Sequence, residues 1–379
     1  MKAILERLSY QPHRGSASRE AASARQRLVT LLRSRGHEVR RQPFKGPQSD
    51  TWDLVGIFLV LAVAGLVPSG WLALVGVYAF WAYFSRWPLP WAALRNRSDA
   101  ANLIARAGRG RRTLMLMAHV DTATPLFVHH PNNVRGFRAN FLVLSAQALA
   151  LVPLAFLWLP GARVVGILFL ALAAVVVLRE RGGEPVNGAN DNASGVAVAT
   201  QLFLDLPEHL MNEWQIMLAL TGCAEVGNQG ARKLLSSGLI PKDALILNLD
   251  SVGQGQLCYV ESEGMLLPQR AQGKLLELAR KLPNAEPTRF HLEPLDTLLF
   301  SRAGYSCLTL TRLEGGVPAH WHWKTDTLEA INLPAVANTY AYARILIERA
   351  GVALPAPVDE AEAHYTPRTW KPESDEYEV

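Results

Sequence analysis

Two pairs of long apolar runs constrain the fold of this 379-residue chain more than any other feature. The first pair covers residues 54–84 and the second covers residues 141–178, and the only charged residue in either is Arg163. Pro and Gly interrupt each pair near its middle, at 68–70 and at 160–161. Because Pro and Gly end helices, each pair predicts two apolar helices joined by a short turn.

The lengths of these runs indicate membrane hairpins. Residues 141–159 form an apolar run of about 19 residues, which is the length that a helix needs to cross a bilayer core. Each arm of the first pair has about 14–17 residues, slightly short for a core of about 30 Å. We therefore predict two inserted transmembrane helical hairpins, at residues 51–87 and 139–181, with the lipid bilayer as a partner. Buried core helices, and a re-entrant or interfacial first hairpin, are the alternatives.

The positive charges predict which side of the membrane the rest of the chain occupies. Two hairpins return the chain to its starting side, so all soluble segments share one face. Arg and Lys residues flank the hairpins on that face, whereas the hairpin tips carry only Arg163. The positive-inside bias then places the soluble domain on the cytoplasmic side of an inner or plasma membrane.

The remaining composition excludes several classes of protein. The formal net charge is +5, but the Arg clusters flank apolar runs, which suits anionic lipid headgroups better than nucleic acid. The Arg-rich stretch 108–112 has no interleaved aromatic residues, so no nucleic-acid partner is predicted. Three scattered cysteines are too few for a disulfide framework or a cysteine-type zinc site.

Outside the hairpins, short apolar runs alternate with helical patterns. This alternation predicts an α/β fold, a sheet with helices on both faces. In such sheets, ligands bind beyond the carboxyl ends of the strands. The expected strands are 39–44, 102–105, 113–117, 215–220, 245–249 and 307–310, and the expected helices are 16–35, 196–206, 230–236, 269–282 and 333–350.

Five side chains able to bind a metal stand where predicted strands end or turns begin: His119, Asp191, Glu225, Asp250 and His322. Two imidazoles and three carboxylates suit a dinuclear zinc site with one bridging carboxylate. Asp121 lies two residues after His119, and in an extended segment both side chains point the same way. Asp121 is therefore expected to accept a hydrogen bond from the imidazole of His119.

These residues belong to motifs that follow one another in a fixed order. They are Ala-His-Val-Asp-Thr at 118–122, Gly-Ala-Asn-Asp-Asn-Ala-Ser-Gly at 188–195, Ala-Glu-Val-Gly-Asn-Gln-Gly at 224–230, Asp250 after a strand, and His-Trp-Lys-Thr-Asp-Thr at 322–327. The set resembles metallopeptidase family 28, the co-catalytic zinc aminopeptidases, whose relatives include glutaminyl cyclases and the non-catalytic transferrin receptor. The resemblance covers about residues 10–350 once the hairpins are excluded.

The resemblance implies a fold, a function and a role for each matching residue. The fold would be a zinc-exopeptidase-like mixed sheet with helices on both faces, and the substrate would be a peptide or an aminoacyl compound. Two zinc ions would be bound, with Asp191 as the bridge and Asp121 orienting His119. His119 and Asp250 would hold one ion, and Glu225 and His322 the other. His320 lacks the family spacing to Asp326, and we expect either a substrate contact or a surface residue there.

One position departs from the family pattern. The family has Glu-Glu where this chain has Ala224-Glu225, and the first Glu is the general base. An alanine cannot transfer a proton, so hydrolysis is expected to be slow unless another group substitutes. Three explanations stay open: an inactivated variant of an active peptidase, a pseudoenzyme that binds metal and peptide, or another carboxylate that reaches the water, with Glu184 as the nearest guess.

The predicted domain organisation is discontinuous. Residues 1–50, 88–138 and 182–352 would form the peptidase-like domain, and residues 353–379 a disordered acidic tail. The leading interpretation is a membrane-anchored zinc exopeptidase of the aminopeptidase type, in which a metal-bridging water attacks the substrate carbonyl. The alternative is a catalytically dead metal-binding receptor or scaffold of the same fold. The sequence does not predict the oligomeric state.

Overall fold

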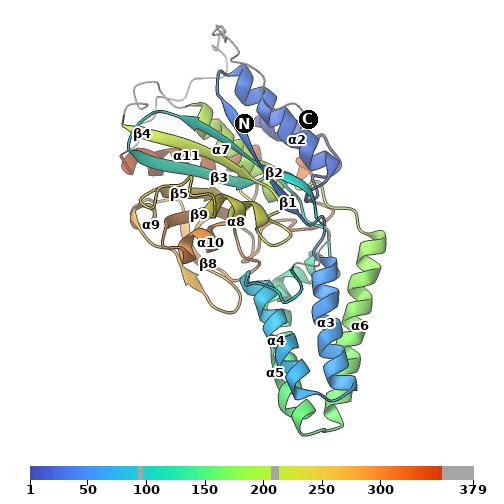
Figure 1. Ribbon diagram of the computed structural model, residues 1–379. Coiled ribbons are helices and arrows are strands. Elements are labelled where there is room, and N and C mark those ends of the chain that lie inside the picture. The colour runs from blue at the N-terminus through green and yellow to red at the C-terminus, as the bar shows by residue number, and fades with distance from the viewer. Residues whose placement is uncertain (93–96, 206–212, 352–379) are drawn as a thin grey trace.

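A mixed sheet forms the centre of the larger part of the molecule in the computed structural model (Figure 1). The structure describes residues 1–92, 97–205 and 213–351. The strand order is β1-β2-β4-β3-β5-β9-β6-β7, and β8 pairs with β6. The strands are β1 (Val39–Gly46), β2 (Ser98–Ala107), β3 (Arg112–His119), β4 (Trp214–Thr221), β5 (Leu245–Leu249), β6 (Gln256–Glu263), β7 (Gln269–Arg270), β8 (Glu286–Phe290) and β9 (Ser306–Leu313).

The central strands β4, β3, β5 and β9 are parallel, and helices cover both of their faces. Leu114 and Leu116 of β3 pack toward one face, whereas Met115 and Met117 pack toward the other. The first face is covered by α1 (Lys2–Ser9), α2 (Arg19–Ser34), α7 (Gly195–Leu204), α9 (Lys274–Ala279) and α11 (Leu333–Arg349). The second is covered by α8 (Gln229–Leu235) and α10 (Thr297–Arg302).

Four apolar helices project from one end of the sheet domain (Figure 1). They are α3 (Thr51–Leu66), α4 (Gly70–Ser85), α5 (Phe137–Phe156) and α6 (Gly161–Gly182). A Cβ atom on Gly65 of α3 would lie 2.4 Å from the carbonyl oxygen of Ala162 at the start of α6. The absence of a side chain at Gly65 therefore lets the two helix backbones touch.

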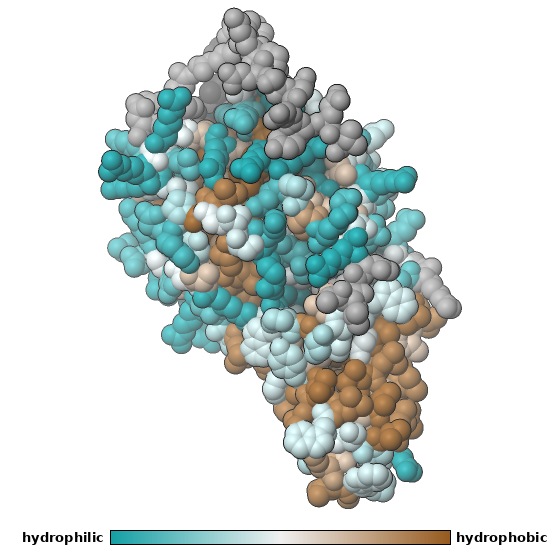
Figure 2. Space-filling model, in the orientation of Figure 1, coloured by the Kyte–Doolittle hydropathy of each residue, from teal (hydrophilic) through white to brown (hydrophobic). Residues whose placement is uncertain are grey.

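The surface of this helical projection is largely apolar (Figure 2). Residues 134–156 and 161–180 are helical and are long and apolar enough to cross a membrane, whereas α3 and α4 are shorter. The alternative of buried core helices does not fit, because the four helices stand away from the sheet and expose many large apolar side chains, including Leu142, Val143, Ile167 and Leu168.

Most of the expected strands and helices are present, but the segment 256–290 differs. The helix expected at 269–282 is restricted to α9, and residues 269–270 form the short strand β7. Strands β6 and β8 were not predicted, and neither were helices α1 and α10. The acidic tail predicted at 353–379 lies outside the described residues.

Candidate metal centre

The five side chains predicted to bind metal come together at the carboxyl ends of the parallel strands. His119 is the last residue of β3, and Asp250 directly follows β5. Glu225 lies in the turn after β4, Asp191 precedes α7, and His322 lies in the loop after β9. This edge of the sheet is where parallel α/β sheets usually bind their ligands.

Asp191 lies between the two histidines. Its Oδ1 atom is 3.2 Å from Nε2 of His119, and its Oδ2 atom is 3.2 Å from Nε2 of His322. Asp250 Oδ2 lies 3.6 Å from His119 Nε2, and Glu225 Oε2 lies 3.2 Å from His322 Nε2. The cluster thus divides into two imidazole–carboxylate pairs that share the carboxylate of Asp191.

The protonation of this buried cluster fits a site for divalent cations. Burial raises the pKa of Glu225 to about 7 and that of Asp250 to about 6. Burial opposes protonation of His322, but the charge of Glu225 and the hydrogen bond with Asp191 raise its pKa well above the usual range. Among the residues that the structure describes, none forms a hydrogen bond with the buried Oε1 atom of Glu225. Cations can deprotonate such ligands and use such an unpaired oxygen.

Asp121 supports the centre in a different way from the one predicted. The Nδ1–H group of His119 donates to the backbone carbonyl of Asp121 at 3.0 Å, whereas the carboxylate is 3.9 Å away. That carboxylate instead accepts hydrogen bonds from the hydroxyl of Ser16 and from the backbone N–H groups of Ala224 (3.0 Å) and Glu225 (3.2 Å). Asp121 therefore fixes the tautomer of His119 through its backbone and fixes the Ala224–Glu225 turn through its side chain.

Asp326 and Arg14 hold the segment that carries Asp191. The carboxylate of Asp326 accepts the backbone N–H groups of Asn190 (2.6 Å) and Asp191 (3.0 Å). Arg14 is fully buried, and its guanidinium donates to backbone carbonyls of Leu8, Val120, Asn187 and Gly188. These bonds tie the end of β3 to the loop before α7, so the two halves of the centre keep their spacing.

Glu184, the residue suggested as a replacement for the missing base, does not line the cavity around Ala224. Ala224 lines a small cavity together with all five predicted ligands, and Glu293 also lines it. Glu184 lines a different cavity, with Pro12, Lys324 and other residues. His320 lines neither of these cavities, and its Nδ1 atom lies 2.7 Å from the hydroxyl of Thr325.

Two residues near the centre were not predicted. Glu293 lies in the loop after β8, and one of its carboxylate oxygens lies within 4.8 Å of a ring nitrogen of both His129 and His322. His129 is buried, and burial lowers its pKa well below the usual range. Its Nδ1 atom accepts the backbone N–H group of Leu126, so Nε2 carries the proton, and no described residue accepts a hydrogen bond from Nε2. The only signal in the sequence was the pair of histidines at 129–130.

Comparisons with known proteins agree with this arrangement. The model of peptidase family M28 matches residues 102–347. No curated protein is significantly similar in sequence. Among solved structures, a glutaminyl cyclase from Porphyromonas gingivalis is 14% identical over 92% of this chain and 96% of its own, with a TM-score of 0.54. A leucine aminopeptidase precursor from Bacteroides thetaiotaomicron is 15% identical over 90% and 93%, with a TM-score of 0.52. A zinc aminopeptidase from Bacillus subtilis is 12% identical over 92% and 94%, with a TM-score of 0.54. These likenesses concern the fold.

Proposed function

The chain belongs to peptidase family M28, and from this premise we propose that it is a membrane-anchored, zinc-dependent exopeptidase of the aminopeptidase type. One observation carries the proposal. The two oxygens of Asp191 each lie 3.2 Å from the Nε2 atom of a different histidine. A buried carboxylate in that position can bridge two metal ions, and such a pair suits hydrolysis of peptide bonds.

The proposed ligand roles follow the two pairs. His119 and Asp250 would hold one zinc ion, Glu225 and His322 the other, and Asp191 both. Zinc ions held there would polarise the carbonyl of the substrate and activate water. The protein fixes the ligands before the substrate arrives, because the Nδ1–H group of His119 is already bound to a carbonyl and Asp191 is held through its own backbone.

We propose that Glu293 replaces the base that is missing at position 224. Its carboxylate would accept a proton from the attacking water while the new C–O bond forms. The same carboxylate would return the proton to the nitrogen that leaves as the C–N bond breaks. Glu293 is suited to this because it lines the same small cavity as Ala224 and is tethered by Arg86, whose Nη2 atom lies 3.7 Å from Oε2.

The four apolar helices would anchor the enzyme. Both hairpins would cross the membrane, and the sheet domain would lie on the cytoplasmic side of an inner or plasma membrane. Support for this comes from the apolar surface of the projection and from the Arg and Lys residues at its base. Peptides or aminoacyl compounds would be the substrates of the sheet domain.

A second function is favoured by one observation. Ala224 lines the same small cavity as the predicted ligands, and it cannot transfer a proton. If Glu293 does not act as a base, the protein would be a metal-binding membrane receptor or scaffold that binds peptides without cleaving them.

Metal analysis tests the proposed centre. We expect about two zinc ions per chain after purification without chelator, and loss of both in Asp191→Ala, because Asp191 serves both halves. Asp243→Ala removes an exposed carboxylate from the surface and should keep both ions. Loss of one ion only in Asp191→Ala would disprove the bridge, and no stoichiometric metal in the unmodified protein would disprove the centre. A panel of aminoacyl and peptide substrates then separates the enzyme from the receptor.

A further inference from the structure

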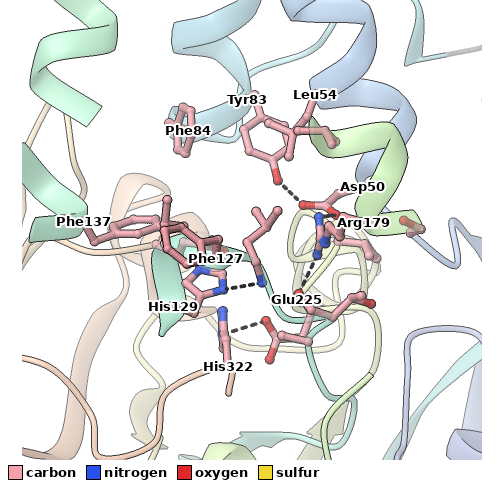
Figure 3. Close-up of a pocket in the computed structure, with 18 of the residues that line it drawn as sticks. Asp50, Leu54, Tyr83, Phe84, Phe127, His129, Phe137, Arg179, Glu225 and His322 are labelled. Atoms are coloured by element: carbon pink, nitrogen blue, oxygen red, sulfur yellow. Dashed lines mark hydrogen bonds and ion pairs between the residues drawn. The ribbon is translucent and has the colours of Figure 1, made fainter. Parts of the chain in front are cut away.

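A larger cavity connects the metal centre to the helical projection. Its volume is about 290 Å³, and its lining includes Glu225 and His322 at one end. The same two residues also line the small cavity around Ala224. The two cavities therefore meet at the half of the centre that Glu225 and His322 form. Figure 3 shows these two residues on one side of the space and Leu54, Tyr83 and Phe84 on the other.

The far walls of this cavity come from all four apolar helices. Apolar side chains from α3, α4, α5 and α6 line it, including Leu54, Phe58, Phe84, Phe141, Leu144 and Leu172. Among the charged groups that line the cavity, Arg179 and Asp50 pair with each other, and Glu293 lies near Arg86, which is outside the lining. Arg179 Nη1 lies 3.2 Å from Asp50 Oδ1, and the hydroxyl of Tyr83 donates to the same carboxylate (Figure 3). The space therefore suits an apolar chain far better than a polar one.

The exposed residues of the cavity lining are Phe127 and Val175, which are apolar, and Gln48 and Asn140, which are polar. Phe127 and Val175 line the cavity although 73% and 52% of their surfaces are exposed. Val175 belongs to α6, one of the two helices long and apolar enough to cross a membrane. With α6 in the membrane as proposed, the part of the opening at Val175 would face the acyl chains of the bilayer. An apolar chain can enter there without crossing water.

One unpaired polar group points to an amide beside the apolar wall. His129 is only 3% exposed, lines the cavity and presents an Nε2–H group that has no partner in the described part of the chain. A hydrogen bond to a buried donor of this kind should strengthen the binding of an acceptor by about fivefold. Figure 3 shows His129 next to His322, so a carbonyl oxygen held by His129 would lie beside the metal centre.

We propose that the substrate is a single-chain amphiphilic amide, whose acyl or alkyl chain fills the cavity between the hairpins while its amide bond lies between His129, Glu225 and His322. This inference rests on the proposed function, because it assigns the substrate class of the same centre. Each methylene that leaves water for the cavity should strengthen binding about fourfold, until the chain fills the available space.

Binding measurements test the proposal without requiring turnover. The zinc content of the full chain in detergent is measured first, and the dissociation constants of two ligand series follow by calorimetry. N-acyl amino acids carry the chain on the carbonyl side, and aminoacyl alkylamides carry it on the nitrogen side. We expect about fourfold tighter binding per methylene in at least one series, and the series that shows it identifies the side of the bond that bears the chain.

Matched variants distinguish the cavity from the detergent and the outer surface. Leu54→Trp fills the cavity from α3 and should remove the dependence on chain length. Leu59→Trp adds the same side chain to the exposed surface of α3 and should keep it. Leu54→Ala enlarges the cavity, so the affinity should stop rising only at a longer ligand chain. His129→Phe should weaken every ligand by up to about tenfold and leave the slope unchanged.

The outcomes separate the inference from the function on which it rests. Two results would overturn the amphiphile proposal and leave the exopeptidase proposal standing. One is an equal change in the dissociation constant per methylene in Leu54→Trp and Leu59→Trp. The other is a zinc-loaded protein whose affinity does not depend on chain length in either series. A protein that binds no zinc would instead overturn the proposed centre. A protein that hydrolyses short polar peptides and does not bind long-chain amides would also refute the amphiphile proposal.

Discussion

A double substitution cycle between positions 224 and 293 tests where the base of this centre lies. Ala224→Glu should restore a carboxylate next to Glu225 without moving the backbone, because the N–H group of residue 224 is held by Asp121 at 3.0 Å. Glu293→Gln removes the proposed replacement and keeps the size of the side chain. Both positions line the same small cavity, so the two changes are expected to be strongly coupled.

The expected size of the coupling follows from what a positioned base contributes. General-base catalysis gives about 10²- to 10⁴-fold, or about 3–5 kcal/mol of transition-state stabilisation. Glu293→Gln in the unmodified chain should therefore lower kcat by at least about 10²-fold. The same change combined with Ala224→Glu should lower kcat very little, because the restored glutamate takes over.

The assay is steady-state hydrolysis of an aminoacyl or long-chain amide substrate at saturating concentration, which gives kcat, with the zinc content measured for each of the four proteins. Glu184→Gln is the control, since Glu184 lines another cavity and should not change the rate. Equal rates for the unmodified chain and Glu293→Gln would refute the role of Glu293. If Ala224→Glu also gave no activity on any substrate, the receptor function would replace the exopeptidase.

Three further predictions concern orientation and stability. Single cysteines at Ser69 and Gly161 should react with an impermeant reagent applied to intact cells, and one at Ser236 should not. The three native cysteines are buried and should add no signal. Strong reaction at Ser236 would indicate the opposite orientation. Burial raises the pKa of Glu263 to about 8, above its usual value near 4.5, so the folded protein holds a proton that the unfolded chain releases. Unfolding free energy should therefore fall by up to about 5 kcal/mol as the pH rises from about 4.5 to 8, and Glu263→Gln should remove this part of the fall in denaturant titrations; an unchanged profile would contradict the burial argument. Arg14→Met should lower the unfolding free energy by about 3 kcal/mol or more, because several buried carbonyls lose their donor; a shift in thermal unfolding of only a degree or two would contradict this.

The meeting of the five candidate ligands could be expected in part from the strands, because His119 ends one apolar strand and Asp250 follows another. Asp191 and His322 do not stand at strand ends and were recognised through their motifs alone. Short-range patterns also predicted the strands around His119 and Asp250 and the four apolar helices. The pattern placed Asp121 on the same side as His119, but it could not tell a backbone carbonyl from a carboxylate as the hydrogen-bond acceptor.

The residues near the centre that were missed depend on contacts that the sequence does not show locally. Glu293 follows β8, an edge strand with mostly exposed side chains and an internal proline, so its pattern resembles a loop. His129 reaches the centre only because the loop before α5 folds back against His322, with ring centroids 4.8 Å apart. The cavity between the hairpins likewise depends on long-range packing between α3 and α6.

The hairpins leave and re-enter the sheet domain at four places, near residues 50, 86, 136 and 183. A protein held by one linker can swing away from a membrane, whereas four connections would hold this domain at one height and in one orientation. In a bilayer the metal centre would therefore stay at a constant depth. The rate with an amphiphilic substrate would then depend on the mole fraction of that substrate in the membrane. Dilution of the membranes in more buffer, at the same ratio of substrate to lipid, would leave the rate unchanged.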